Sequence, residues 1–414
     1  MKIYDEKIKQ ELITKKHYRD ILDGICCVVS SIEDSNLIKE CFVELLKPWI
    51  THLHSAKTQL DSNQPLTKED NSIVINILDI MKVIVKRGYS EIKINDFGIF
   101  SQIFTEIWDI IKVFLTSNNY NILESVIQLI KYFMRGMVNE FKPFLKEYLY
   151  YSKIGYDRMS APPLLYAFEI SLTVYINDED EETKDLLKHM LKELIFKTFN
   201  SYLTSIKDYN DKPQLSEDFF GLMFRITKLH PFFILESELF ETLLYNSIIY
   251  LDVPHLDTSN NIIYFINKLI VFHKHKKTQK LLDNKEFGFY YEKMKNNVLK
   301  FGDMLVTKII NYLLTYPSGI VYDHLKDLIA DILLQFPKEA GIWFSKASES
   351  LDSDILTNSE KIKMIALIES LFNSHNDITD PKELAETLNT LEEKFMEYID
   401  LIYKRSLSKI MRSK

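Results

Sequence analysis

Glycine and proline are too scarce in this chain to build a fold of strands and tight turns. Its 414 residues include 10 glycines and 11 prolines, together about 5%, where about 12% is usual in globular proteins. β-Sandwiches, barrels and glycine-rich nucleotide folds need turn residues at short, regular intervals. Because 46% of the residues are hydrophobic and 27% are charged, the composition instead favours an all-helical protein.

Apolar residues recur at three- and four-residue spacings along almost the whole chain, which predicts a succession of amphipathic helices. The predicted helices cover residues 18–31, 36–60, 70–88, 99–117, 121–138, 141–153, 161–176, 183–207, 215–230, 236–251, 259–276, 286–315, 320–336, 338–350, 359–373 and 380–412.

Short links join these helices into pairs with a period of about 40 residues, which is typical of HEAT and armadillo repeats. A globular helical bundle is the alternative, but a single core of so many helices would exceed the size at which cores stop growing. We therefore expect residues 1–414 to form one HEAT/armadillo-like α-solenoid, with an extended C-terminal helix over 380–414.

The charge balance and the termini exclude several classes of function. The formal net charge is −8, whereas a general nucleic-acid binder presents a basic surface. The N-terminal residues lack the apolar segment of a signal peptide, and no apolar run is long enough to span a membrane. Cys26, Cys27 and Cys41 lack metal-ligand spacing and indicate buried thiols in a reducing compartment. We expect no direct nucleic-acid binding and no membrane insertion.

Motifs for catalysis, cofactors or metals are missing from the sequence, so we expect a protein that is not an enzyme. It has no phosphate loop, no dinucleotide-binding glycine motif, no H-E-x-x-H and no C-x-x-C. His273 and His275 are two positions apart and so do not share a helix face. With Lys274, Lys276 and Lys277, they are interpreted as a solvated basic helix end or as a patch for an acidic partner.

An acidic run over 177–182 (NDEDEE) lacks the glycine and the later glutamate of a calcium-binding loop. The run precedes a predicted helix, where the helix N-terminus stabilises carboxylates. The alternative is an acidic loop that contacts basic cargo or Ran.

Four stretches, in order, resemble one helical-repeat family. They are ILDGICCVVSSIEDSNLIKECFVELLKPWITHL (21–53), a segment over 103–175 that contains EIWDIIKVFL, the pair of segments 215–235 and 243–270, and YPSGIVYDHLKDLIADILLQFPKEAGIWFSKASESL (316–351). The markers within them are Trp108, Arg225, Pro231, Pro337 and Trp343. On these motifs the chain resembles the C-terminal half of the importin-β (karyopherin-β) superfamily, specifically its transportin-SR and importin-thirteen branch.

This resemblance implies a nuclear transport receptor that works by binding alone and needs no cofactor. Family members bind protein cargo for import, contact Phe-Gly nucleoporins at the nuclear pore, exchange cargo against Ran-GTP, and move between cytoplasm and nucleus. The main Ran-binding repeats of the family are N-terminal, so the resemblance implies that they are missing here. A fragment, a truncated gene product and a paralogue without Ran control remain open, and a HEAT scaffold without a transport cycle is the alternative function.

One binding site follows from the resemblance residue by residue. In the transportin-SR branch a helix projects arginines that receive phosphorylated Arg-Ser segments, and the matching helix here is ILESVIQLIKYFMRG (122–136). Ser125, Gln128, Lys131 and Arg135 stand at the arginine positions, and their spacing puts them on one face. Since only Lys131 and Arg135 are basic, the alternative is that both are ordinary solvated residues beside an apolar stripe.

Overall fold

The computed structural model describes residues 15–62, 64–91, 98–178, 180–274, 284–315, 317–377 and 381–413. Within these ranges the chain is an all-α solenoid, in which successive helices pack on near neighbours in the sequence and no strand occurs. The predicted fold class is thereby confirmed. The chain divides into two compact units, Met1–Met190 and Leu191–Lys414, and the boundary falls within helix α9 (Glu181–Lys197).

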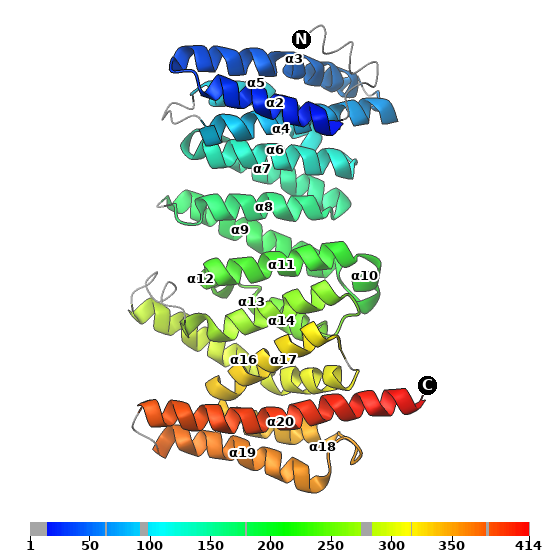
Figure 1. Ribbon diagram of the computed structural model, residues 1–414, viewed down its shortest axis with the longest axis vertical. Coiled ribbons are helices and arrows are strands. Elements are labelled where there is room, and N and C mark those ends of the chain that lie inside the picture. Colours follow the sequence, from blue (N-terminus) through cyan, green and yellow to red (C-terminus); the bar gives the residue numbers. More distant parts are fainter. Residues whose placement is uncertain are drawn as a thin grey trace. The chain divides into compact units, whose positions relative to one another are not determined.

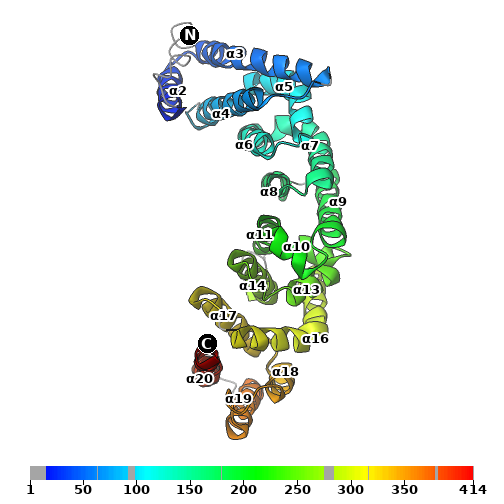
Figure 2. The same ribbon diagram turned by 90° about the vertical axis from the view of Figure 1, so that its right-hand side faces the viewer.

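The first unit arranges its helices in two rows (Figures 1 and 2). In one row each helix packs on the next, and the row comprises α2 (Lys15–Ser30), α4 (Lys68–Glu91), α6 (Tyr120–Gly136) and α8 (Pro162–Tyr175). The second row comprises α3 (Ser35–Asp61), α5 (Gly98–Leu115) and α7 (Val138–Met159).

The second unit follows the same plan with more irregular connections. Its helical segments are η1 (Thr198–Tyr202), α10 (Ile206–Asp211), α11 (Pro213–Leu229), α12 (Pro231–Glu236), α13 (Phe240–Ile249), α14 (Leu256–Val271), η2 (Phe272–Lys274), α16 (Asn284–Leu314), α17 (Gly319–Gln335), α18 (Pro337–Glu349), α19 (Asn358–Asp377) and α20 (Pro381–Ser413). Helices α11, α14 and α17 pack in succession, while α16 packs on α13 and α18 (Figure 2).

Local signals in the sequence set many helix starts. Asp34, Asn119 and Ser318 accept hydrogen bonds from the first backbone amides of α3, α6 and α17, which satisfies donors that a helix leaves unpaired at its start. Helices α8, α11, α12 and α18 each begin with a proline, at a position where the missing N–H costs nothing. Because these residues start a new helix soon after the previous one ends, the links between helices are short.

Aromatic side chains fill the core of the first unit between its two rows. The ring of Phe104 lies 4.9 Å from that of Phe133 on α6, 5.1 Å from Phe141 on α7, and 5.4 Å from Trp108. All four side chains are at most 6% exposed. Because the Phe104 ring contacts α6 of the first row and α7 of the second row, it connects the two rows.

One glycine in the second unit lets two helices approach closely. A Cβ placed on Gly302 of α16 would lie 2.2 Å from the indole of Trp343 on α18. Only a residue without a side chain fits beneath that ring. Trp343, a marker of the family resemblance, is thus packed as part of the core.

The predicted helix over 183–207 is wrong in its last part. Helix α9 ends at Lys197 and, after one turn of π-helix in η1, α10 begins at Ile206. Ser205 and Asp208 form a capping box, in which the serine hydroxyl accepts from the Asp208 amide and the aspartate accepts from the Ser205 amide. This reciprocal cap starts a new helix within a stretch whose apolar spacing continues unchanged.

Smaller differences concern helix boundaries. The predicted helix over 236–251 begins too early, because Glu236 is the last residue of α12 and α13 starts only at Phe240. Pro143, predicted near a helix boundary, lies inside α7 because that helix already begins at Val138. In both cases the apolar spacing located the helix but did not fix the residue at which it begins.

The last helix packs along the second unit. Helix α20 contacts α16, α17 and α19, and Figure 1 shows it as the long red helix beside them. The ring of Tyr403 stacks on Tyr322 of α17, with centroids 3.9 Å apart, and its hydroxyl donates to the Pro317 carbonyl at 2.8 Å. Lys326 Nζ lies 3.0 Å from Asp400. These contacts fix α20 against α17.

Candidate functional site

The predicted cargo-binding residues lie on α6, and three of the four reach its exposed side. Gln128 and Lys131 are half-buried and Arg135 is exposed. Ser125 is only 8% exposed, because α6 packs on α4 and on α8 and little of its surface remains open. The solvent-facing stripe of α6 therefore contains Gln128, Lys131 and Arg135, with Ser125 inside the unit.

Two tyrosine rings, one from α6 itself and one from α8, lie near the ammonium group of Lys131. Its Nζ lies 5.6 Å from the ring centre of Tyr132 and 5.4 Å from that of Tyr166 on α8. Lys86 on α4 places its Nζ 5.9 Å from the Tyr132 ring. Together with Arg135 we call these residues the basic–aromatic face. It joins α4, α6 and α8 in a single surface.

The cations of the basic–aromatic face remain available to a partner. Lys86, Lys131 and Arg135 make no ion pair with a carboxylate within the described ranges, whereas Lys82 on α4 is 2.7 Å from Asp79. Contact with a ring face orients an ammonium without neutralising its charge. Phosphate and carboxylate groups are the natural ligands of such a surface.

The residues that marked the family resemblance support the fold. Trp108 Nε1 donates to Glu147 Oε2 on α7 at 2.7 Å, and Trp343 covers Gly302. Arg225 is exposed on α11. Two of these markers are therefore packing residues, which explains why they identify an architecture rather than a chemistry.

The acidic run over 177–182 contacts the chain's own residues. Lys142 Nζ on α7 lies 3.0 Å from Asp178 Oδ2 and 3.2 Å from Asp180 Oδ2. Asp180 also accepts a hydrogen bond from the Thr183 hydroxyl at 2.7 Å, at the start of α9. The hydrogen bonds from Thr183 and then from Lys142 lower the pKa of Asp180. This agrees with the helix-start interpretation for both aspartates.

Parts of two predicted features lie outside the described residues. These are Glu179 of the acidic run and His275, Lys276 and Lys277 of the basic patch. His273 is described, and burial is the main cause that lowers its pKa. Its ring lies 5.1 Å from that of Tyr291 on α16, and the residue is half-buried. The side chain of His273 therefore packs against α16.

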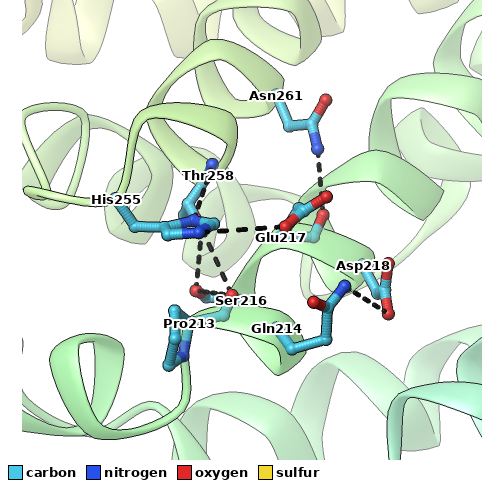
Figure 3. Close-up of polar contacts among 8 residues, drawn as sticks. All are labelled: Pro213, Gln214, Ser216, Glu217, Asp218, His255, Thr258 and Asn261. Atoms are coloured by element: carbon cyan, nitrogen blue, oxygen red, sulfur yellow. Dashed lines mark hydrogen bonds and ion pairs between the residues drawn. The ribbon is translucent and has the colours of Figure 1, made fainter.

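A polar cluster between α11 and α14 was missed from the sequence. Glu217, His255 and Asp257 each offer one side-chain donor atom within 4.8 Å of the others, and Figure 3 shows the imidazole of His255 facing the Glu217 carboxylate. Burial raises the pKa of Glu217, and the negative charges of Asp257 and Asp218 add to this effect. Because the residues come from two helices, no local motif marks them.

Comparison with known proteins identifies the fold. No family model and no curated protein matches the sequence. Among solved structures, the chain is similar to importin-13 in its cytosolic state, with a TM-score of 0.69 and 16% sequence identity; the similarity covers 93% of this chain and 41% of the importin-13 chain. The fold is therefore importin-β-like.

At this identity the similarity establishes the architecture of a karyopherin-like helical-repeat protein. This chain spans less than half of the importin-13 chain to which it is similar. Among the described residues, no helix is both long enough and apolar enough to cross a membrane.

Proposed function

We propose that this chain is an importin-type nuclear transport receptor, or the C-terminal part of one, that binds protein cargo for import through the nuclear pore. The observation that carries the proposal is the fold likeness to importin-13 over 93% of the chain. An α-solenoid offers long helix rows to a partner and depends on surface contact rather than on a catalytic centre. We accordingly propose that it acts without catalysis, in the cytoplasm, the nucleus and the pore.

The cargo site in this proposal is the basic–aromatic face. Its three exposed or half-buried cations come from α4 and α6, and Tyr166 extends the surface onto α8. A phosphorylated Arg-Ser segment would place its phosphates on Lys131 and Arg135. The tyrosine rings would contact the aliphatic and guanidinium parts of the same segment. Gln128 adds one neutral hydrogen-bonding group on the same stripe.

The other proposed partners are Phe-Gly nucleoporins and Ran-GTP. In the family that this chain resembles, the main Ran site belongs to N-terminal repeats, whereas the sequence motifs of this chain resemble the C-terminal half. We therefore expect Phe-Gly binding by this chain and weak Ran-GTP binding at most. The proposal is thus mainly about cargo and the pore.

A peptide-binding experiment tests the cargo site. Fluorescence anisotropy with a phosphorylated Arg-Ser peptide should give saturable binding, at least ten-fold tighter than the unphosphorylated peptide. The double variant Lys131→Glu/Arg135→Glu should lose at least ten-fold in affinity. A matched double variant on exposed positions of the second unit, Lys338→Glu/Arg412→Glu, should bind as the wild type does. Equal loss in both variants would refute a specific site.

A second experiment separates transport from scaffolding. The chain is incubated with immobilised Phe-Gly peptide and with immobilised Ran-GTP, each against a Ser-Gly peptide or Ran-GDP control. Binding to Phe-Gly peptide supports the receptor. Failure to bind either ligand would leave the HEAT scaffold as the function, even if the phosphopeptide binds.

A further inference from the structure

His255 is held in a fixed orientation at the start of α14. Its Nδ1 lies 2.9 Å from the Thr258 hydroxyl, which lies 2.9 Å from the Ser216 hydroxyl on α11. Ser216 in turn donates to the Pro213 carbonyl at 2.8 Å. Figure 3 shows these contacts on one side of the imidazole and Glu217 on the other. The ring is therefore positioned by Nδ1, and Nε2 points toward Glu217.

The hydrogen-bond chain is compatible with the imidazole tautomer that binds a metal. A carbonyl only accepts, so Ser216 donates to Pro213 and receives a hydrogen bond from Thr258. The Thr258 hydroxyl is then free to accept from Nδ1–H of His255. In the other tautomer Nδ1 accepts a hydrogen bond from the Thr258 backbone amide at 3.4 Å, which caps the start of α14. When Nδ1–H donates to the Thr258 hydroxyl, Nε2 carries the lone pair, which is the form of histidine that ligates a metal.

Two carboxylates lie beside that nitrogen. Glu217 Oε2 is 3.9 Å from His255 Nε2, and one oxygen of Asp257 completes a set within 4.8 Å. Among the described residues, neither Glu217 nor Asp257 forms an ion pair with a lysine or arginine, and Glu217 has only the imidazole of His255 beside it. Asp257 is in the first turn of α14. The cluster therefore combines one imidazole with two carboxyl groups that have no lysine or arginine partner.

From this geometry we propose that Glu217, His255 and Asp257 bind a divalent transition-metal ion of the Zn²⁺ class. One nitrogen and two oxygens suit zinc, manganese or iron, whereas calcium and magnesium prefer oxygen ligands alone. Ligands about 2.0–2.1 Å from a tetrahedral zinc lie about 3.3 Å apart. Binding would require the donor atoms to close from within 4.8 Å to this spacing by side-chain rotation, and Asp257 is exposed and Glu217 half-buried.

Metal binding at this position would join two helices that already pack together. Glu217 is on α11, whereas His255 and Asp257 begin α14, and Asn261 Nδ2 donates to the Glu217 carbonyl at 3.0 Å nearby. An ion bound only by the folded unit stabilises it by mass action. The proposed site is therefore structural, and it is independent of the basic–aromatic face and of the transport proposal.

Zinc binding by the full chain tests this inference. After chelator treatment and dialysis, isothermal titration with Zn²⁺ should show one saturable high-affinity site, and zinc should raise the melting temperature. The key variant is His255→Asn, because asparagine still caps α14 but removes the Nε2 ligand. It should weaken zinc binding at least ten-fold and abolish the zinc-dependent thermal shift.

Two further variants keep the test decisive. Glu217→Gln should weaken zinc binding at least ten-fold as well, with circular dichroism showing unchanged helicity. His54→Asn makes the same chemical change at an exposed histidine of α3 and should titrate as the wild type. The proposal is overturned if the wild type shows no saturable zinc binding. It is also overturned if both His255→Asn and Glu217→Gln bind zinc with the same affinity as His54→Asn.

Discussion

Arg405 of α20 forms two parallel hydrogen bonds with the carboxylate of Glu360 in α19, each 2.9 Å long. The same guanidinium donates to the Ile355 carbonyl at 3.0 Å. The hydrogen bond from Arg405, followed by that from the Thr357 backbone, lowers the pKa of Glu360 to about 2. A bidentate pair of this kind specifies geometry as well as attraction, so it fixes where α20 docks.

This pair predicts a pH-dependent contribution to stability. The folded pKa of Glu360 lies below its usual 4.5, so the contribution is fully present above pH 4.5 and is lost as pH falls toward 2. We expect Arg405→Gln to cost about 1–2 kcal/mol at pH 7 and much less at pH 3. Urea denaturation at both pH values measures this. Lys404→Gln, on the exposed neighbour, is the control; an unchanged penalty at pH 3 would contradict the assignment.

The contact of Gly302 with Trp343 predicts a large effect from one methyl group. Gly302→Ala places its Cβ 2.2 Å from the indole, so α16 and α18 must separate or the tryptophan must leave its position. We expect a loss of about 1–3 kcal/mol, as for other overpacked cores. Gly288→Ala on the same helix has no atom within 4 Å and should stabilise by about 0.5–1 kcal/mol. Thermal denaturation of both variants should therefore shift in opposite directions.

The aromatic core of the first unit predicts a cavity cost. Phe104→Ala removes a ring that is 0% exposed and contacts α6 and α7. We expect a loss of about 3–5 kcal/mol and lower near-ultraviolet circular dichroism. Phe104→Leu retains most of the volume and should cost clearly less. Equal costs for the two variants would show that packing volume does not determine the effect.

The capping box at Ser205 predicts a smaller and local effect. Ser205→Ala removes the acceptor for the Asp208 amide and should cost about 1 kcal/mol. Hydrogen exchange should show faster exchange in α10 with little change in α8. Ser205→Asn restores a capping side chain and should recover most of the loss, whereas a general loss of protection would argue against a local role.

The basic–aromatic face predicts a strong salt dependence of ligand binding. Lys86, Lys131 and Arg135 make no ion pair within the described chain, and the Debye length falls from about 10 Å at 0.1 M salt to about 3 Å at 1 M. Affinity for a phosphorylated peptide should therefore fall steeply as salt rises. Lys86→Gln should reduce the slope of that dependence, as Lys131→Gln should, while Lys338→Gln should not.

Apolar spacing predicted nearly every helix of this chain because the solenoid buries a stripe on each one. Apolar spacing failed to predict a helix boundary where a change in backbone direction ends the helix although apolar residues continue at the same spacing. The stretch around Ser205 keeps its apolar spacing through a break, and only the serine–aspartate cap reveals the new helix start. Helix α12 (Pro231–Glu236) lies almost entirely between two predicted helices and was missed, and α13 starts at Phe240 rather than at Glu236. Apolar spacing thus predicts which helix face is buried, whereas a break between two helices is predicted only from the capping residues.

The candidate site was predictable only in part. Spacing placed Lys131 and Arg135 on one side of α6, but it could not show that α4 and α8 cover Ser125. Tyr166 was missed because it comes from the next helix in the row. Figure 3 shows the same limitation for Glu217 and His255, which belong to different helices and meet only after folding. Contacts between helices, rather than within one, create these surfaces.

The packing of each helix on near neighbours in the sequence has a consequence for how the protein is made. Because α4 packs on α6 and α6 on α8, a helix leaving the ribosome finds its partners among segments synthesised shortly before or after it. Chains rich in such local contacts fold quickly and can do so during synthesis. The nascent chain can therefore bury each apolar stripe soon after it emerges, which shortens the time during which chaperones are needed.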